Sequence, residues 1–167
     1  VDFIYGAGTS VFEDCDIVAR YTEYKSDGCY TAGRTYASTP YGYVFNNCRF
    51  LAEEGVADGV YRMARPWGAD DSTTFMNCYL GRAISLETSY GDMSGNLAEN
   101  ARFAEYGSYG PGYTVNNKRP YLTSAQAAKF KTDTVMGDYD YSARTATLYG
   151  TQQEKPKTDI TVVDKAE

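Results

Sequence analysis

The chain has 167 residues, which is enough for one domain with a substantial hydrophobic core. Its formal net charge of −6 argues against nucleic acid as a partner, and no apolar run reaches the ~18–20 residues that span a bilayer. The absence of histidine excludes Ser-His-Asp and Cys-His triads in their usual forms and every His-ligated metal site. In a hydrolase of this composition, carboxylates and arginines must carry the chemistry.

The sequence begins with VDFIYG, an apolar stretch that predicts a strand and contains one carboxylate, Asp2. A buried carboxylate is costly unless it is paired or hydrogen-bonded. Asp2 is therefore either a structural residue satisfied by its neighbours or a functional one, and the stretch alone leaves both readings open.

Three later stretches repeat one pattern: VFEDCDIV at 11–18, VFNNCRFL at 44–51 and TFMNCYLG at 74–81. Each reads Phe, any residue, Asp or Asn, Cys, any residue, apolar, and apolar positions alternate with polar ones as in a half-buried strand. Repeats of roughly 20–50 residues are typical of solenoids. Because the repeats are short strands separated by Gly-, Asn- and Pro-containing turns, they predict a right-handed parallel β-helix.

Equivalent positions of the three copies should form rows along such a solenoid. We expect an interior phenylalanine row and a polar row that shares side-chain hydrogen bonds. The phenylalanines are Phe12, Phe45 and Phe75, and the polar residues are Asp14, Asn47 and Asn77.

The cysteines of the repeat are expected to be reduced, small, buried residues in a third row. These are Cys15, Cys48 and Cys78; Cys29 lies outside the repeat. No pair has the C-x-x-C spacing of a zinc or redox site. Disulfides remain the alternative, because an even number of cysteines permits them.

The C-terminal part changes character. LTSAQAAKF at 122–130 predicts a short helix with Thr123 or Ser124 as its N-cap. From about Gly150 the chain is polar and charged. We therefore expect one β-helix domain over residues 1–150 and a polar tail or linker over 151–167, in which ITVV is a possible strand.

Two further stretches stand apart from the repeat: YRMARPWG at 61–68 and SYGDMSG at 89–95. Arg65 lies beside a proline and the only tryptophan, Trp67, although an arginine next to an aromatic ring is often just a stacked surface pair. Met93 alone would be interpreted as a core residue. Singly, these residues are weak indications of a site.

Taken in order, the motifs resemble the pectin methylesterases, the carbohydrate esterases that remove methyl groups from homogalacturonan. VDFIYG is similar to that family's VDFIFG, TAGR at 31–34 to its TAQGR, and YRMARPWG to its YLGRPW. DMSG, ARFAEYGSYGPG at 101–112 and LTSAQAAKF resemble the C-terminal part of the bacterial members. The resemblance extends from residue 1 to about residue 150.

The resemblance implies a role for each matching residue. Asp2 would be the nucleophile and Arg65 the residue that orients it through a salt bridge. Four residues would contact the sugar chain: Val1, Tyr5, Trp67 and Met93. The resemblance also implies no metal or other cofactor, pectin as the partner rather than nucleic acid or a membrane, and a secreted or periplasmic location.

The chemistry of these residue types agrees with the implied roles. A carboxylate must be ionised to act as a nucleophile, and an arginine fork beside it favours that form and fixes its lone pairs. Attack on a methyl ester would release methanol and leave an anhydride-like acyl-enzyme, which water then hydrolyses. This route requires neither serine nor histidine.

The chain also departs from the family pattern. Met63-Ala64 replaces Leu-Gly before the arginine, Tyr5 replaces a phenylalanine, and Tyr90 stands where a tryptophan is common. In the family, a Gln-Asp pair that supplies the general acid, and a further Gln of the oxyanion hole, precede VDFIFG. We therefore expect this chain to be the C-terminal half of the enzyme and to be inactive without the other half.

Two other functions remain as alternatives. One is a non-catalytic β-helix that binds pectic polysaccharide and has lost turnover. The other is a polysaccharide lyase, which usually needs calcium held by an acidic cluster; the sequence shows no such cluster around Arg65.

Overall fold

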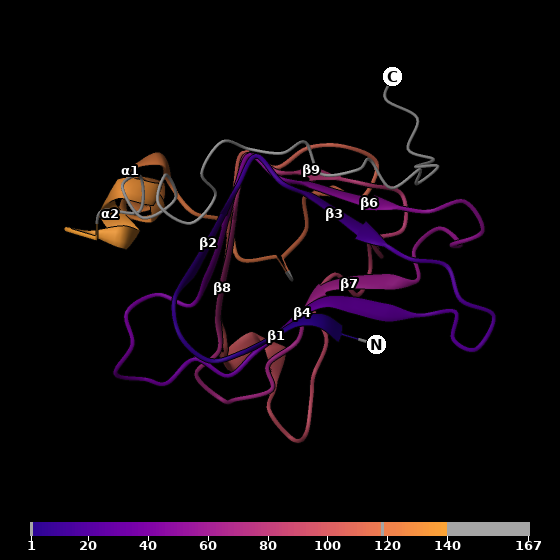
Figure 1. The fold of residues 1–167 in the computed structure, drawn as a ribbon, viewed down its shortest axis with the longest axis horizontal. Coiled ribbons are helices and arrows are strands. Elements are labelled where there is room, and N and C mark those ends of the chain that lie inside the picture. The colour runs from indigo at the N-terminus through magenta and orange to yellow at the C-terminus, as the bar shows by residue number, and fades with distance from the viewer. Residues whose placement is uncertain (1, 118, 140–167) are drawn as a thin grey trace, which may run out of the picture.

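The computed structural model of the chain describes residues 2–117 and 119–139, and these form a solenoid of parallel strands. Its walls are three sheets, which Figure 1 shows as the sides of a triangle. Sheet A contains β1 (Asp2–Gly6), β4 (Gly28–Gly33) and β7 (Tyr61–Ala64). Sheet B contains β2 (Ser10–Glu13), β5 (Tyr43–Asn46), β8 (Ser72–Met76) and β10 (Arg102–Tyr106). Sheet C contains β3 (Asp16–Ala19), β6 (Arg49–Ala52) and β9 (Tyr79–Leu80).

Each strand pairs in parallel with the equivalent strand of the next coil. Asp2 is in register with Cys29, Phe12 with Phe45, and Ile17 with Phe50. The prediction of a parallel β-helix is therefore confirmed.

The Asp or Asn that recurs in each copy of the repeat lies at the corner where the chain passes from sheet B to sheet C. Asp14, Asn47 and Asn77 have φ values of 54°, 52° and 52°, a left-handed conformation that Asp and Asn adopt more readily than other side chains. Asn47 donates a hydrogen bond from Nδ2 to Asp14 Oδ1 over 2.6 Å. The fourth coil, whose strand in sheet B is β10, places Gly107, with φ of 65°, at the same corner. The predicted polar row is thus a row of corner residues.

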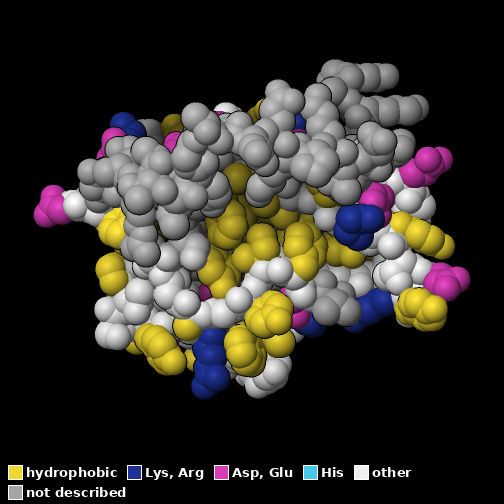
Figure 2. Space-filling model, in the orientation of Figure 1, with side chains coloured by type: hydrophobic (Ala, Val, Ile, Leu, Met, Phe, Trp, Pro, Cys, Tyr) yellow, Lys and Arg dark blue, Asp and Glu magenta, His cyan; other side chains and the backbone are white. Residues whose placement is uncertain are grey.

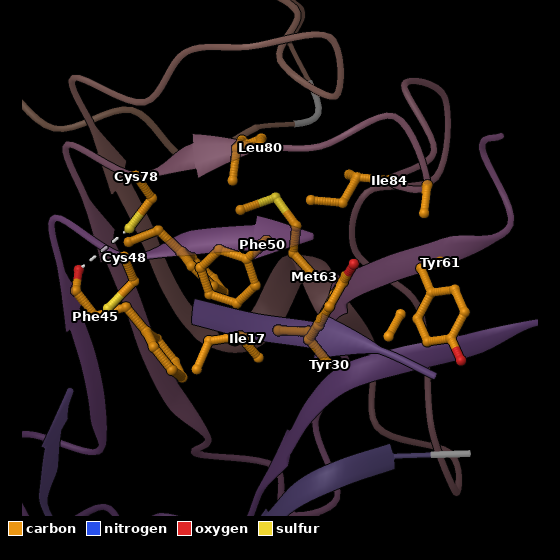
Figure 3. Close-up of a cluster of buried hydrophobic side chains, with 14 of the residues drawn as sticks. Ile17, Tyr30, Phe45, Cys48, Phe50, Tyr61, Met63, Cys78, Leu80 and Ile84 are labelled. Atoms are coloured by element: carbon orange, nitrogen blue, oxygen red, sulfur yellow. Dashed lines mark hydrogen bonds between the residues drawn. The ribbon is translucent and has the colours of Figure 1, made fainter. Parts of the chain in front are cut away.

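The phenylalanine row stacks inside the solenoid as predicted. The ring centroids of Phe12 and Phe45 lie 4.6 Å apart, and those of Phe45 and Phe75 lie 5.3 Å apart, with nearly parallel planes in both pairs. Phe50, from sheet C, meets Phe45 and Phe75 edge-on at 5.2 Å. Figure 3 shows how Phe45 and Phe50 pack with Tyr30 and the other buried side chains. The aromatic rows of neighbouring coils form the centre of the core.

The predicted reduced state of the cysteine row is also found. Cys15, Cys48 and Cys78 are free cysteines, and so is Cys29. Cys48 and Cys78 are buried as predicted, whereas Cys15 is only partly buried. The Cys78 thiol donates to the carbonyl oxygen of Phe45 over 3.5 Å, one coil back, as the dashed line in Figure 3 marks. Burial raises the pKa of Cys48 to about 11 and that of Cys78 to about 12. These thiols therefore behave as small buried donors rather than as nucleophiles.

The predicted C-terminal helix begins at the expected place but is shorter and interrupted. α1 (Ser124–Ala127) has Thr123 as its N-cap, and Thr123 and Gln126 form a capping box. A 3₁₀ turn (Ala128–Phe130) follows, then extended Lys131, then α2 (Thr132–Met136). The helices lie outside sheet B (Figure 1), where Asn46 Nδ2 donates to Thr132 Oγ1 over 2.9 Å.

Two sequence predictions lie outside the described residues. These are the polar tail at 151–167 with its possible ITVV strand, and the domain boundary at residue 150.

Within residues 2–117 and 119–139, no helix has the length and apolar character needed to cross a membrane. Figure 2 shows hydrophobic side chains gathered in the middle of one face, between the three sheets.

The fourth coil contains a buried ion pair that the sequence analysis did not predict. Arg119 donates to both carboxylate oxygens of Glu105, over 2.8 and 2.7 Å, and each side chain is only 1% exposed. Tyr90 donates from its hydroxyl to Glu105 Oε1 over 2.9 Å, and its ring stacks on Phe103. Tyr90 therefore directs its polar end into this cluster.

Candidate active site

The structure joins the two residues for which the sequence predicts a salt bridge. Asp2 begins β1, and Arg65 follows β7 directly, 63 residues later in sequence. Arg65 donates from Nε to Asp2 Oδ1 and from Nη2 to Asp2 Oδ2, each over 2.7 Å. The predicted contact is therefore confirmed as a two-bond fork.

This ion pair is sheltered but still reached by solvent. The Asp2 side chain is 12% exposed and that of Arg65 is 29% exposed. Hydrogen bonding to Asp2 is the main cause that raises the pKa of Arg65, so the guanidinium stays charged. A carboxylate has about four lone-pair positions, and the fork uses one on each oxygen. The remaining lone pairs leave Asp2 able to attack an electrophile.

The backbone of sheet A fixes where Arg65 leaves the strand. The Arg65 N–H donates to the carbonyl oxygen of Thr31 over 3.1 Å, and Ala64 is in register with Thr31. Ala64 and Met63 are fully buried. The Met63-Ala64 departure from the family pattern therefore leaves a regular strand end, from which Arg65 still reaches Asp2.

Cys29 belongs to this site, although the sequence analysis left it outside the repeat. It is in register with Asp2 on one side and with Arg62 on the other, and it is 1% exposed. Its thiol donates to Thr31 O over 3.1 Å. Burial, followed by the charge of Asp2, raises the pKa of Cys29 to about 12. Applying the spacing of the repeat to the strands of sheet A would have identified Cys29 as a neighbour of Asp2.

Tyr5 and Trp67, two of the residues expected to contact the sugar chain, lie next to one another. Their ring centroids are 6.4 Å apart in an edge-on arrangement, and they are 67% and 40% exposed. The guanidinium carbon of Arg34 lies 5.4 Å from the centroid of the Trp67 ring. Exposed aromatic faces of this kind suit stacking against a sugar ring.

Met93 is connected to Trp67 through a tight turn. Met93 and Asn96 exchange backbone hydrogen bonds of 3.0 and 2.8 Å across Ser94 and Gly95. Asn96 Nδ2 also donates to the carbonyl oxygens of Pro66 and Trp67, over 3.2 and 3.0 Å. The turn that carries Met93 is thus fastened to the backbone of the tryptophan.

Val1, the remaining predicted contact residue, lies outside the described residues. No group of three or more Cys, Asp or Glu side chains suited to a metal ion occurs within the described part of the chain.

A cavity of about 610 Å³ near Phe103 and Arg119 includes none of the predicted site residues in its lining. The predicted site residues therefore lie outside this cavity, and the candidate site is the region around the Asp2–Arg65 fork.

Comparison with known proteins agrees with the solenoid and its motifs. The pectinesterase family model matches residues 1–138. Pectinesterase A of Dickeya dadantii is 38% identical over 83% of this chain. The chain belongs to the pectinesterase family.

Solved structures extend the comparison to the fold. A pectin methylesterase from Yersinia enterocolitica matches 84% of this chain with a TM-score of 0.73 and 27% identity. A mutant pectin methylesterase in complex with a hexasaccharide matches 83% with a TM-score of 0.71 and 32% identity. This chain spans 45% of the length of the Dickeya enzyme and covers 51% and 48% of the two structures.

Proposed function

We propose that the full-length protein carrying these residues hydrolyses the methyl esters of homogalacturonan and releases methanol. The observation that supports this most directly is the Asp2–Arg65 fork, with both nitrogen-to-oxygen distances at 2.7 Å, beside the exposed ring of Trp67. Family membership and similarity to an enzyme solved with a hexasaccharide support the same substrate class.

In the proposed mechanism Asp2 is the nucleophile and Arg65 a positioning residue. A carboxylate oxygen of Asp2 attacks the ester carbonyl carbon, and the bond to the methoxy oxygen breaks. Methanol leaves with a proton from a general acid, and the acyl group remains on Asp2 as an anhydride. Water then adds to the anhydride, which frees the galacturonate carboxylate and restores Asp2.

The sugar-binding residues are proposed to hold the chain along this groove. Trp67 offers an aromatic face, Tyr5 an aromatic edge and a hydroxyl, and Met93 a flexible apolar contact beside Trp67. We extend the proposal to Val1 on the resemblance alone. The general acid and the oxyanion donors are proposed to come from the part of the enzyme that precedes VDFIYG in the family.

Pectin is therefore the proposed partner, and the proposed location is outside the cytoplasm, as is typical of this family. The first test is methanol release from methylated pectin by the full-length protein. We expect activity in the wild type, none above background in Asp2→Asn, and a loss of about 10²-fold or more in Arg65→Lys, which keeps the charge but not the fork.

Two results would contradict the proposal. Retained pectin binding without methanol release in the wild type would favour the non-catalytic binding module. Release of unsaturated products, followed by their ultraviolet absorbance, would favour a lyase.

A further inference from the structure

The corner between sheets B and C contains a hollow on the opposite side of the solenoid from the candidate active site. Its volume is about 440 Å³, and its lining includes Asp14, Asp16, Asn47, Cys48, Arg49 and Tyr109. Figure 1 shows this corner at the vertex of the triangle that faces away from sheet A, the sheet in which Asp2 lies. We call it the corner hollow, and none of the residues of the candidate active site lines it.

An exposed aromatic ring forms one wall of the corner hollow. Tyr109 is 54% exposed, and its ring meets that of Tyr79 edge-on with 5.6 Å between the centroids. The Tyr109 N–H donates to the carbonyl oxygen of Cys78 over 3.0 Å, and the Tyr109 carbonyl oxygen accepts from the Leu80 N–H over 2.7 Å. Because the backbone is held on both sides, the ring has a fixed position from which its exposed surface can stack against a sugar ring.

Two polar pairs form the rest of the corner hollow, and each pair joins neighbouring coils. Arg49 donates from Nε to Asp16 Oδ1 over 2.7 Å and from Nη2 to Asp16 Oδ2 over 2.5 Å. Asn47 donates from Nδ2 to Asp14 Oδ1 over 2.6 Å. A guanidinium has five N–H donors and a carboxylate about four lone-pair positions. Because the pairs use only part of this capacity, donors and acceptors at fixed spacing remain for the hydroxyl groups of a ligand.

The charges of the corner hollow disfavour an anionic ligand. Asp14 and Asp16 are both negative, and the positive charge of Arg49 is already paired with Asp16. Arg49 is the only cation among the described residues that line the hollow, and the whole chain has a net charge of −6. A sugar with a free carboxylate would therefore be repelled, whereas a methyl ester is uncharged and is not.

We propose that the corner hollow is a second polysaccharide-binding site, which takes methyl-esterified and therefore uncharged galacturonate units of pectin. This inference rests on the proposed function and extends it to a surface outside the groove. The ring of Tyr109 stacks against one sugar ring, and the two polar pairs hydrogen-bond its hydroxyl groups. A long pectin chain that contacts both surfaces is held more tightly than one held by the groove alone, because the second contact forms at a high effective concentration. The site thus retains the protein on pectin that still carries esters.

Calorimetry on full-length protein carrying Asp2→Asn, which blocks turnover, tests this site. Fully methylated hexagalacturonate should bind in two events. Tyr109→Ala should weaken one event about tenfold, and Trp67→Ala should weaken only the other. Tyr109→Phe, which keeps the ring, should retain both events. Tyr24→Ala is the matched control, because it removes a tyrosine that is 90% exposed and lies outside the hollow.

Two exposed substitutions test the polar pairs and leave the ring in place. In the Asp2→Asn protein, unmethylated hexagalacturonate should bind at the hollow about tenfold more weakly than the methylated ligand. Asp16→Asn, which leaves Arg49 without its carboxylate partner, should reduce this difference to about threefold or less. Arg49→Gln should weaken the methylated ligand about threefold or more. Denaturation midpoints equal to that of the parent protein show that these variants are folded.

The outcomes separate this site from the groove and from the proposed reaction. One binding event that Trp67→Ala removes and that Tyr109→Ala and Arg49→Gln leave unchanged would overturn the second site. Equal affinity of the hollow for the unmethylated ligand, or for the neutral glucan cellohexaose, would overturn its assignment to esterified pectin. Wild-type protein that releases no methanol would contradict the proposed function alone, because the binding measurements do not depend on turnover.

Discussion

Glu105 lies in parallel register with Phe75, so the fourth coil places a carboxylate where the preceding coil has a stacked phenylalanine. The carboxylate is fully buried, and Arg119 and Tyr90 supply its hydrogen bonds. The aromatic row of the solenoid therefore ends on an ion pair.

Removing one partner of this pair should be costly. We expect Glu105→Ala to lower the free energy of unfolding by about 3–5 kcal/mol, because Arg119 would remain buried and charged without its partner. Urea denaturation measures this loss. The double variant Glu105→Leu with Arg119→Met should recover much of it; a double variant as unstable as Glu105→Ala would contradict this explanation.

The centre of the phenylalanine stack should contribute more than its end. Phe45 is fully buried between two rings, whereas Phe12 is partly exposed. We expect Phe45→Ala to cost about 3–5 kcal/mol and Phe12→Ala clearly less. The loss in unfolding free energy of each variant is measured from the shift of its denaturation midpoint, with the dependence on denaturant concentration unchanged. Equal costs would show that the interior row is not continuous.

Asp71 should make stability depend on pH. Burial raises its pKa to about 6 from 3.8, although the Gly33 and Ser72 N–H groups, the Thr35 hydroxyl and Arg102 act in the opposite direction. The folded state therefore favours protonated Asp71. The stabilising contribution is complete below about pH 4 and is lost as the pH rises through about 6.

The test compares the wild type with Asp71→Asn, which cannot ionise. Between pH 4.5 and 7.5 the unfolding free energy of the wild type should fall relative to the variant by about 2 kcal/mol. Asp70→Asn, at the exposed neighbouring position, controls for the change in net charge. A pH-independent difference between the wild type and Asp71→Asn would rule out this titration.

The thiols should react only after unfolding. With pKa values raised to about 12 for Cys29 and Cys78 and about 11 for Cys48, these side chains are protonated and buried at pH 8. We expect Ellman's reagent to find four thiols in guanidinium chloride, and to label Cys29, Cys48 and Cys78 only slowly in the native protein. A count of two in denaturant would indicate a disulfide.

Residues 1–167 alone are expected to release no methanol from methylated pectin above background. The general acid and the oxyanion donors are proposed to come from a part of the enzyme that precedes VDFIYG in the family, and losing a single such donor commonly costs ~10²–10³ in rate. Strands β1, β2 and β3 also pair on one side only among the described residues. Supplying the preceding half, linked or as a separate chain, should restore turnover. Robust activity of the isolated chain would show that its own residues provide these groups.

The sequence predicted the parts of the fold that repeat. Three copies of Phe-x-(Asp/Asn)-Cys were enough to predict the parallel coils, the stacked rings and the free thiols, because each position recurs in the same environment. The fourth coil was missed because Glu105 and Gly107 replace the phenylalanine and asparagine that identify the pattern. Its carboxylate is stable there only through Arg119, a partner that no local pattern reveals.

The site was predictable only in part, and for a different reason. The resemblance named Asp2 and Arg65, and the structure joins them, but their chemical roles stay proposals. Cys29 and Arg34 were not identified as neighbours of Asp2 and Trp67, because these residues meet only across coils. The register with Asp2 and the cation over Trp67 are properties of the assembled solenoid.

The corner between sheets B and C has the same length in each of the first three coils. Two residues connect the strands there: Asp14 and Cys15, Asn47 and Cys48, Asn77 and Cys78. The connections from sheet A to sheet B differ in length from coil to coil, and they carry Arg34, Arg65 and Trp67. The molecule therefore has an invariant side and a variable side. Insertions and exchanges can accumulate after sheet A without changing the two-residue corner between sheets B and C.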